Sequence, residues 1–223
     1  MTVKPLSALL ALCLLGGASL VHAQTVLLSE NFNAENGGTG AAVYSGFANF
    51  TAADVDLLAP GFFFDLCERA GGSTPCIDME GNGNGSLTTK TEYSLPAGTV
   101  GLQFDLAGDQ RTGTGSNVTV SLVNNFGQTL YSETFELSSA TDFTTFSRSV
   151  SLSSAQTARL RFVSGGPADS YGMLLDNVVL TAGVAAAVPE PSTYAMLGTG
   201  LATLLWLRRR SLNRPGNPRD PLA

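Results

Sequence analysis

The sequence predicts an all-β fold, an antiparallel β-sandwich, followed by a single short C-terminal transmembrane helix. Three observations support this prediction. Several segments alternate apolar and polar residues with a period of two, as half-buried strands do. Clusters of Gly, Pro, Asn and Ser separate these segments, with no amphipathic helical pattern between them. Finally, Tyr194–Leu207 is an uncharged, mostly apolar run near the end of the chain.

Residues 1–23 have the three parts of a secretory signal peptide. Lys4 supplies a positive charge, Leu6–Leu15 is apolar, and Val21–Ala23 fits a cleavage pattern. Lipidation of Cys13 is an alternative, but a leucine precedes it where a small residue is needed. We therefore expect Cys13 to be removed with the signal peptide.

The remaining chain is long enough for one domain, which we expect to span residues 24–183 and to be followed by a linker at 184–187. Residues 24–187 contain 16 acidic and 6 basic side chains, a net charge of −10. The basic residues are scattered singly, whereas nucleic-acid phosphates require a clustered basic face. The composition therefore excludes a nucleic-acid partner and fits an exported protein with an acidic surface.

The clearest alternation occurs at Val100–Leu106, Val118–Leu122 and Ala158–Phe162. Further predicted strands are Thr25–Phe32, Ile77–Glu80, Ser86–Tyr93, Thr129–Leu137, Phe143–Leu152 and Met173–Thr181. Turn signals separate them at Gly81–Gly85, Pro96–Gly98, Gly113–Ser116, Asn124–Gly127 and Gly165–Pro167. Alternation also places one face of each strand in water.

Two cysteines, Cys67 and Cys76, remain after the signal peptide. Two cysteines nine positions apart in an exported protein predict one disulfide, which stabilises by ~2–3 kcal/mol through loop closure. A zinc site is the alternative, but no third or fourth soft ligand accompanies the pair. The disulfide is the favoured prediction.

The C-terminal region begins with a hinge at Pro189–Pro191, where fixed φ angles prevent a continuous helix. Ser192 can then cap a helix over Tyr194–Leu207, which would be ~21 Å long against a hydrocarbon core of ~30 Å. The alternative is a buried amphipathic helix, but this run is apolar on all faces. The three arginines that follow predict a transmembrane helix with residues 213–223 as a cytoplasmic tail.

The order of these features resembles the PEP-CTERM sorting signal. The residues that carry the resemblance are the motif Val188, Pro189, Glu190, Pro191 and Ser192 and the basic stop Arg208, Arg209 and Arg210. The resemblance covers residues 188–212, and the tail beyond it is longer than such signals usually carry. It implies recognition by an exosortase, a membrane protease-transpeptidase of Gram-negative bacteria. The protein would be anchored transiently in the inner membrane and then passed to the cell surface or the extracellular space.

The domain itself is similar to galactose-binding-like jelly rolls, which include carbohydrate-binding modules. The segments that carry this likeness are Cys76–Gly81, Gly85–Leu87, Leu95–Gly98, Leu102–Gly108 and Leu174–Leu180. The resemblance implies a jelly roll, in which a structural calcium often lies between the first and last strands. The matching residues are Glu30, Asn33 and Asp176. Without calcium, Asp176 would be an aspartate at a strand bulge or rim.

No catalytic residue is predicted. The only histidine, His22, leaves with the signal peptide, so an enzyme would have to use carboxylates, as glycosidases do. The pairs Asp54/Asp56 and Asp78/Glu80 each share a strand face. Solvated strand edges are the favoured interpretation of both pairs. Asp78, Glu80, Asn82 and Asn84 also alternate oxygen ligands that suit calcium, but a hairpin turn explains this run more simply.

The aromatic residues of the domain favour core packing over a sugar platform for most members. They are Tyr44, Phe47, Phe50, Phe62–Phe64, Tyr93 and Tyr171. Phe62–Phe64 cannot all face the core from one strand, so we expect at least one of them to be exposed or covered by a loop.

Together these features predict an exported, non-enzymatic protein that an exosortase sorts to the surface, where it associates with exopolysaccharide or biofilm. The alternative is a carbohydrate-binding module or a carboxylate-based glycan-active enzyme. The ligand-binding residues are not predicted.

Overall fold

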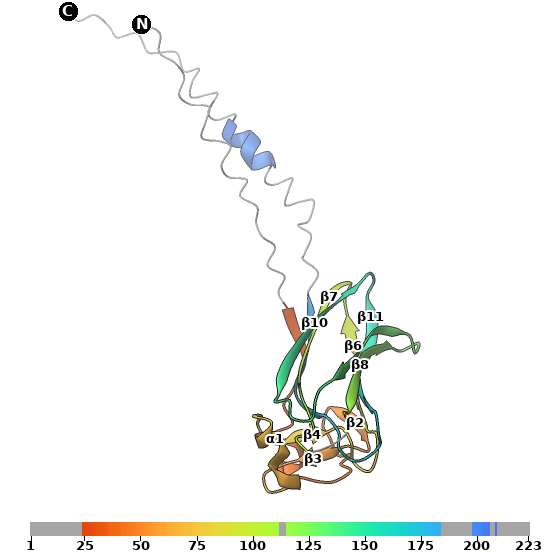
Figure 1. Ribbon diagram of the computed structural model, residues 1–223. Helices are drawn as coiled ribbons and strands as arrows, with labels where there is room; N and C mark the ends of the chain where they lie inside the picture. The colour runs from red at the N-terminus through yellow and green to blue at the C-terminus, as the bar shows by residue number, and fades with distance from the viewer. Residues whose placement is uncertain (1–23, 112–114, 184–197, 206–207, 209–223) are drawn as a thin grey trace, which may run out of the picture. The chain divides into compact units, whose positions relative to one another are not determined.

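The computed structural model describes residues 24–111, 115–183, 198–205 and 208. The chain divides into two units, Met1–Ala185 and Ala186–Ala223. In the first unit, the described strands form two antiparallel six-stranded sheets packed face to face, so the predicted all-β sandwich is confirmed (Figure 1). The predicted signal peptide and linker lie outside the described residues.

Sheet A has the strand order β10-β7-β12-β4-β3, and β1 also pairs with β12. On the side of β12 away from β7, β4 pairs with Leu174 and Leu175, and β1 pairs with the later residues from Val178 to Gly183. Its strands are β1 (Gln24–Glu30), β3 (Asp56–Leu58), β4 (Cys76–Asp78), β7 (Gly98–Ala107), β10 (Thr144–Leu152) and β12 (Leu174–Gly183). The first and last strands of the domain are therefore neighbours, with Gln24 opposite Gly183.

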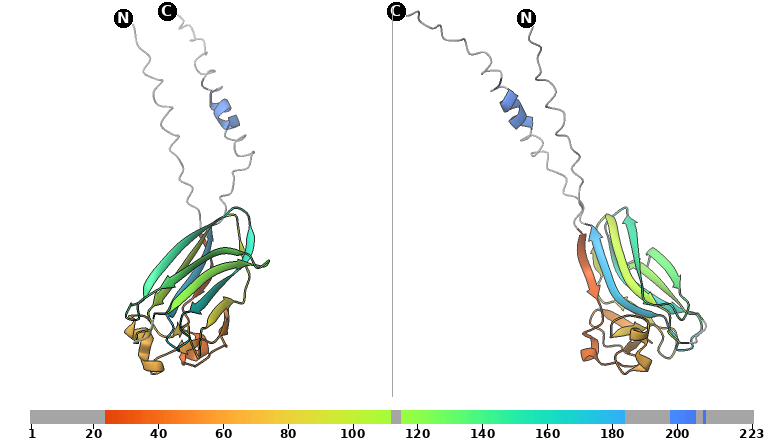
Figure 2. Two further views of the ribbon diagram at one scale, coloured as in Figure 1. Left: turned by 45° about the vertical axis from the view of Figure 1, so that its right-hand side comes forward. Right: turned by 60° about the vertical axis from the view of Figure 1, so that its left-hand side comes forward.

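Sheet B has the order β2-β5-β11-β8-β9, with β6 paired to β11. Its strands are β2 (Phe50–Ala53), β5 (Ser86–Thr89), β6 (Tyr93–Leu95), β8 (Asn117–Asn124), β9 (Thr129–Glu136) and β11 (Gln156–Gly165). Figure 2 shows the two layers from the side. The predicted strand Ser86–Tyr93 is in fact two strands, and β2 and β3 were not predicted.

The core lies between the sheets, where alternate residues of each strand meet. The ring of Phe104 on β7 lies 5.6 Å from that of Phe162 on β11 and 5.2 Å from that of Phe135 on β9. Phe47 and Phe50 are also buried, as the sequence predicted for most of the aromatic residues.

The short helices lie in the connections. They are η1 (Glu35–Gly38), η2 (Phe63–Asp65) and α1 (Leu66–Arg69). A second, smaller apolar cluster packs α1 against sheet A through Leu66, Cys67, Cys76 and Leu174. The predicted disulfide between Cys67 and Cys76 is present within this cluster, with 6.0 Å between the Cα atoms. It covalently joins α1 to β4 and rules out the zinc alternative, because neither sulfur remains a thiolate.

In the second unit, residues 198–205 and 208 are helical. Among the described residues, no helix is both long enough and apolar enough to cross a membrane. The rest of the predicted span lies outside the described residues, as do the hinge, Arg209, Arg210 and the predicted tail. The transmembrane helix therefore stays a prediction.

Candidate functional site

A hollow of about 600 Å³ lies at the end of the sandwich where β12 begins. We call it the end hollow. Its wall comes from seven short stretches of the chain, between Ala42 and Tyr171. The lining residues are Ala42, Val43, Asp56, Phe63, Phe64, Arg69, Gly81, Asn82, Gln110, Arg111, Asp169, Ser170 and Tyr171.

Three aromatic rings of the end hollow are exposed. Phe63 is 40%, Phe64 75% and Tyr171 38% exposed, which confirms that Phe62–Phe64 is not entirely buried. Isolated apolar residues on a surface need no explanation, but three at one concavity are typical of a binding site.

The segment that carries two of these rings is strained. Phe63, Phe64 and Asp65 have φ values of 46°, 64° and 51°, in the left-handed region that side chains other than glycine disfavour. Each such residue costs on the order of 1 kcal/mol or more and persists only where the surroundings impose it. Here the Asp65 carboxylate accepts a 2.6 Å hydrogen bond from the Gly61 N–H, and the disulfide holds the helix that follows. Strain of this kind clusters at binding sites.

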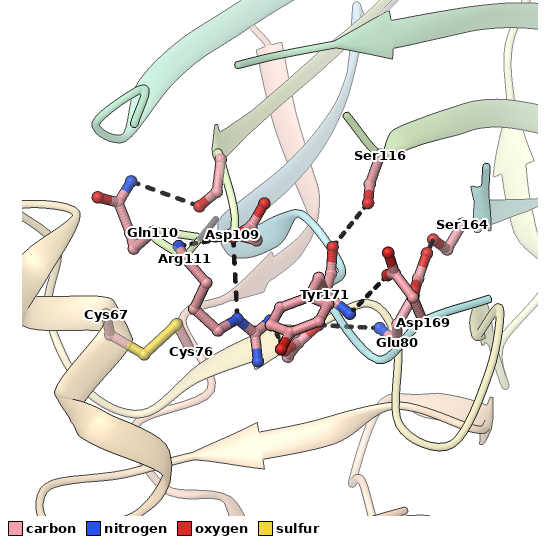
Figure 3. A network of polar contacts seen from close by, with 12 residues as sticks. Cys67, Cys76, Glu80, Asp109, Gln110, Arg111, Ser116, Ser164, Asp169 and Tyr171 are labelled. Carbon is pink, nitrogen blue, oxygen red and sulfur yellow. Dashed lines mark hydrogen bonds and ion pairs between the residues drawn. A yellow bond between two sulfur atoms is a disulfide. The ribbon is translucent and has the colours of Figure 1, made fainter. Parts of the chain in front are cut away.

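Arg111 is the centre of the polar network of the end hollow (Figure 3). Its Nη2 atom donates a 2.7 Å hydrogen bond to Asp78 Oδ2, and its Nε lies 3.8 Å from Asp109 Oδ1. The guanidinium carbon is 4.6 Å from the centre of the Tyr171 ring, a cation–π contact. Arg111 thus fixes the exposed ring of Tyr171 by stacking on it.

The carboxylates that were predicted to be solvated strand edges are mostly buried, so that interpretation is wrong. Asp78 is 1% and Glu80 0% exposed. Burial raises the pKa of Asp78 to about 7, although the Arg111 charge opposes the shift. Burial also raises the pKa of Glu80, which accepts a 2.9 Å hydrogen bond from Ser164 Oγ. Both side chains bind protein groups.

The second pair, Asp54 and Asp56, organises the loops around the hollow. Asp56 is buried and accepts a 2.7 Å hydrogen bond from the Val43 N–H. Asp54 accepts a 2.9 Å hydrogen bond from the Asn82 N–H. The run Gly81–Gly85 is a turn, as predicted, with Glu80 bridged to Asn84.

The predicted calcium residues lie near the junction of β1 and β12. Glu30 accepts hydrogen bonds from the Phe32 N–H at 2.8 Å and from Asn49 Nδ2 at 2.6 Å. Asp176 sits at a β-bulge of β12 and accepts a 3.0 Å hydrogen bond from Ser73 Oγ. Asn33 is exposed on the loop after β1.

Sequence reasoning missed Asp105, which lies opposite Asp176 in the β7–β12 register. Its Oδ1 is buried without a hydrogen-bond partner, so the donor set fits a cation in part. Burial raises the pKa of Asp176 to about 6, with Asp105 and Glu30 adding to the effect. Among the described residues, however, no group of three His, Cys, Asp or Glu side chains is arranged to hold a metal. Calcium therefore stays a prediction.

The C-terminal region is identified by its sequence pattern, not by its structure. The family described as the PEP-CTERM protein-sorting motif matches residues 187–210. Residues 187–210 are a PEP-CTERM sorting motif. This motif contains Val188–Ser192 and Arg208–Arg210, the residues that the sequence analysis singled out. A PEP-CTERM motif implies export and handling by an exosortase.

No curated protein matches this PEP-CTERM chain. Several solved structures are similar to its sandwich. The K3 cleaved adhesin domain of Lys-gingipain from Porphyromonas gingivalis is 22% identical, with a TM-score of 0.41, and the match covers 71% of this chain and 100% of that one. The CBM22-1 xylan-binding domain of Xyn10C from Paenibacillus barcinonensis is 13% identical, with a TM-score of 0.43 and coverage of 74% and 99%. CBM35 from the same organism is 20% identical, with a TM-score of 0.39 and coverage of 65% and 99%.

Proposed function

We propose that this protein is exported, handed to an exosortase through its PEP-CTERM motif, and acts outside the cell as a non-enzymatic protein that binds glycan in the end hollow. Its place would be the cell surface or the exopolysaccharide of a biofilm. The membrane would hold it only transiently, through the helix predicted at 194–207.

The observation that carries the proposal is the meeting of exposed rings and polar groups around one concavity. Phe64 and Tyr171 offer apolar ring surface for the C–H faces of a sugar. Asn82 and Arg111 supply hydrogen-bonding groups within the same wall. A volume of about 600 Å³ lies within the usual range for ligand sites, which combine an apolar lining with a few placed polar groups.

The state of the carboxylates favours binding over hydrolysis. A glycosidase needs an acid and a second carboxylate that both face the substrate. In the wall of the end hollow, Asp56 is buried and accepts a hydrogen bond from the Val43 N–H, and Asp169 accepts one from the Tyr171 N–H. Asp78 and Glu80 do not line the hollow; Asp78 is bonded to Arg111 and Glu80 to Ser164, and both are almost fully buried. We therefore propose a non-enzymatic role, with carboxylate-based hydrolysis as the alternative.

Binding of the purified full chain to a glycan array tests this proposal. Tyr171→Ala and Asn82→Ala are expected to weaken binding of the best glycan about tenfold or more, since each removes a wall contact. Phe126→Ala is the matched control, because Phe126 is an exposed ring on the β8–β9 turn and not part of the end hollow. Unchanged binding by Tyr171→Ala would refute the site, and release of new reducing ends from the bound glycan would favour the enzyme alternative.

A further inference from the structure

The outward face of sheet B carries two arginines that lie two positions apart on the same strand. Arg159 and Arg161 alternate on β11 with the buried Leu160 and Phe162, so both point away from the core. Residues two apart on a strand are separated by about 6.6 Å, which places both guanidinium groups within reach of one extended ligand.

The two arginines differ in their partners. Arg159 pairs with Glu92 at 3.3 Å and donates hydrogen bonds to the carbonyl oxygens of Thr89 and Lys90. Arg161, by contrast, makes no hydrogen bond or ion pair with any residue that the structure describes, and it is exposed.

The other basic side chains of the described domain are engaged with protein groups. Their partners are Gln110 O for Arg69, Phe47 O for Lys90, Asp78 for Arg111 and Glu133 for Arg148. Of the basic side chains that the structure describes in this domain, Arg161 therefore remains available to an external partner. The net charge of the domain is −10.

Hydroxyl groups surround Arg161 on this face. Thr88 on β5 and Ser121 on β8 lie beside it in register, with Thr51 beyond Thr88 and Ser132 beyond Ser121. Ser121 is buried, so Thr51, Thr88 and Ser132 are the hydroxyl side chains that a ligand can reach. We call these residues and the two arginines the hydroxyl face. A hollow of about 460 Å³ over it is lined by Thr88, Glu92, Val123, Asn124, Asn125, Gly127, Arg159 and Arg161. The Glu92 carboxylate in this wall is paired with Arg159.

We propose that the hydroxyl face binds an acidic polysaccharide, through a carboxylate or sulfate group held by Arg161. The guanidinium fork matches these planar or multi-oxygen anions and forms charge-assisted hydrogen bonds with them. The Thr, Ser and Asn side chains on either side match sugar hydroxyls, and the row of paired strands suits an extended chain. This site is separate from the end hollow, and it differs from that site in requiring an acidic group on the glycan.

Charge complementarity favours polysaccharide over nucleic acid. Nucleic-acid binding needs a basic patch that neutralises many phosphates, whereas this face has one unpaired cation on an acidic domain. A polysaccharide that carries one acidic group among many hydroxyls matches the composition of the face.

The test measures binding of the purified full chain to lightly carboxymethylated dextran, lightly sulfated dextran, neutral dextran and single-stranded DNA. We expect the carboxymethylated or the sulfated dextran to bind, and neutral dextran not to compete. Arg161→Gln should weaken the binding about tenfold, the effect of losing one charge-assisted hydrogen bond. Arg148→Gln is the matched control, because it removes the same charge from sheet A and should change the affinity less than twofold. Thermal melts establish that each variant is folded.

The two acidic probes distinguish a carboxylate ligand from a sulfate ligand, and dependence on Arg161 with either one supports the proposal. Equal affinity of Arg161→Gln and the unmodified chain would overturn it, as would absence of binding to both acidic probes.

An equal loss in Arg148→Gln would also overturn it, because the effect would then be one of net charge. Tighter binding of DNA, lost in Arg161→Gln, would overturn the assignment to polysaccharide. Tyr171→Ala should leave this binding unchanged, because Tyr171 lies in the end hollow. The test of the hydroxyl face is therefore independent of whether the end hollow binds glycan.

Discussion

At the scale of single residues, Arg111 connects the buried interior to the end hollow. One side of its guanidinium neutralises Asp78, and its flat face supports Tyr171. Sequence reasoning found Tyr171 and Asp78 separately, but not the arginine that joins them, because 33 residues separate Asp78 from Arg111. The disulfide was predictable, since the chain offered only one pairing after the signal peptide. The unpartnered Oδ1 of Asp105 was not, since it arises from strand register.

The buried Asp78 predicts a dependence of stability on pH. Its pKa is about 7 in the folded protein, against an ordinary 3.8 in the unfolded chain. Between these values the folded state holds a proton that the unfolded state has lost, so the free energy of unfolding falls as the pH rises from about 4 to about 7. The Asp78 contribution is on the order of 4 kcal/mol, since the pKa differs by about 3 units and each unit corresponds to about 1.4 kcal/mol.

Asp78→Asn keeps an oxygen acceptor for Arg111 but does not titrate, so this part of the slope should disappear. Denaturant unfolding of the full chain and the variant from pH 4 to pH 8 measures it. Parallel curves for the two proteins would show that Asp78 is ionised throughout this range.

At the scale of elements, long alternating strands were predictable and short ones were not. β7, β8 and β11 have eight to ten residues with apolar and polar side chains alternating over most of their length, and the sequence located all three. β2 and β3 have four and three residues, and β3 is buried on both faces, so neither shows a period of two. The turn at Gly81–Gly85 was found, but it joins β4 of sheet A to β5 of sheet B, and local pattern does not reveal a change of sheet.

The junction of β1 and β12 is where the calcium prediction is tested. An ion held by Glu30 and Asp176 would bind the folded state alone and stabilise it by about 2.7 kcal/mol at a hundredfold excess over its Kd. Thermal melts of the full chain in chelator, calcium and magnesium at equal ionic strength should show a higher Tm in calcium alone. Asp176→Ala should abolish the shift, and Asp142→Ala, which removes an exposed carboxylate elsewhere, should keep it. Coincident melts in all three solutions would rule out the site.

At the scale of the whole molecule, the destination of the protein was more predictable than its ligand. A sorting motif is contiguous, so its order of motif, apolar run and arginines is visible in the sequence. The end hollow is assembled from segments between Ala42 and Tyr171, and the hydroxyl face from five strands. Residues brought together in this way share no local signal, which is why the sequence analysis named no ligand-binding residue.

Sorting gives a prediction for the intact protein in a host that contains an exosortase. Replacing Pro189, Glu190 and Pro191 by alanine should leave export across the inner membrane intact and block release from that membrane. Cell fractionation followed by immunoblotting measures both steps. Replacing Pro215 and Pro218 by alanine is the matched control, because these prolines follow the basic stop, and release should be normal. Equal release of the motif variant and the control would contradict the role of the motif.

The pairing of Gln24 with Gly183 bears on how the domain is presented. β12 begins beside the end hollow and ends at Gly183, nine residues or about 30 Å farther along the sheet (Figures 1 and 2). The point at which the chain leaves the domain is therefore at the opposite end of β12 from the hollow. A ligand can enter the hollow without passing that point.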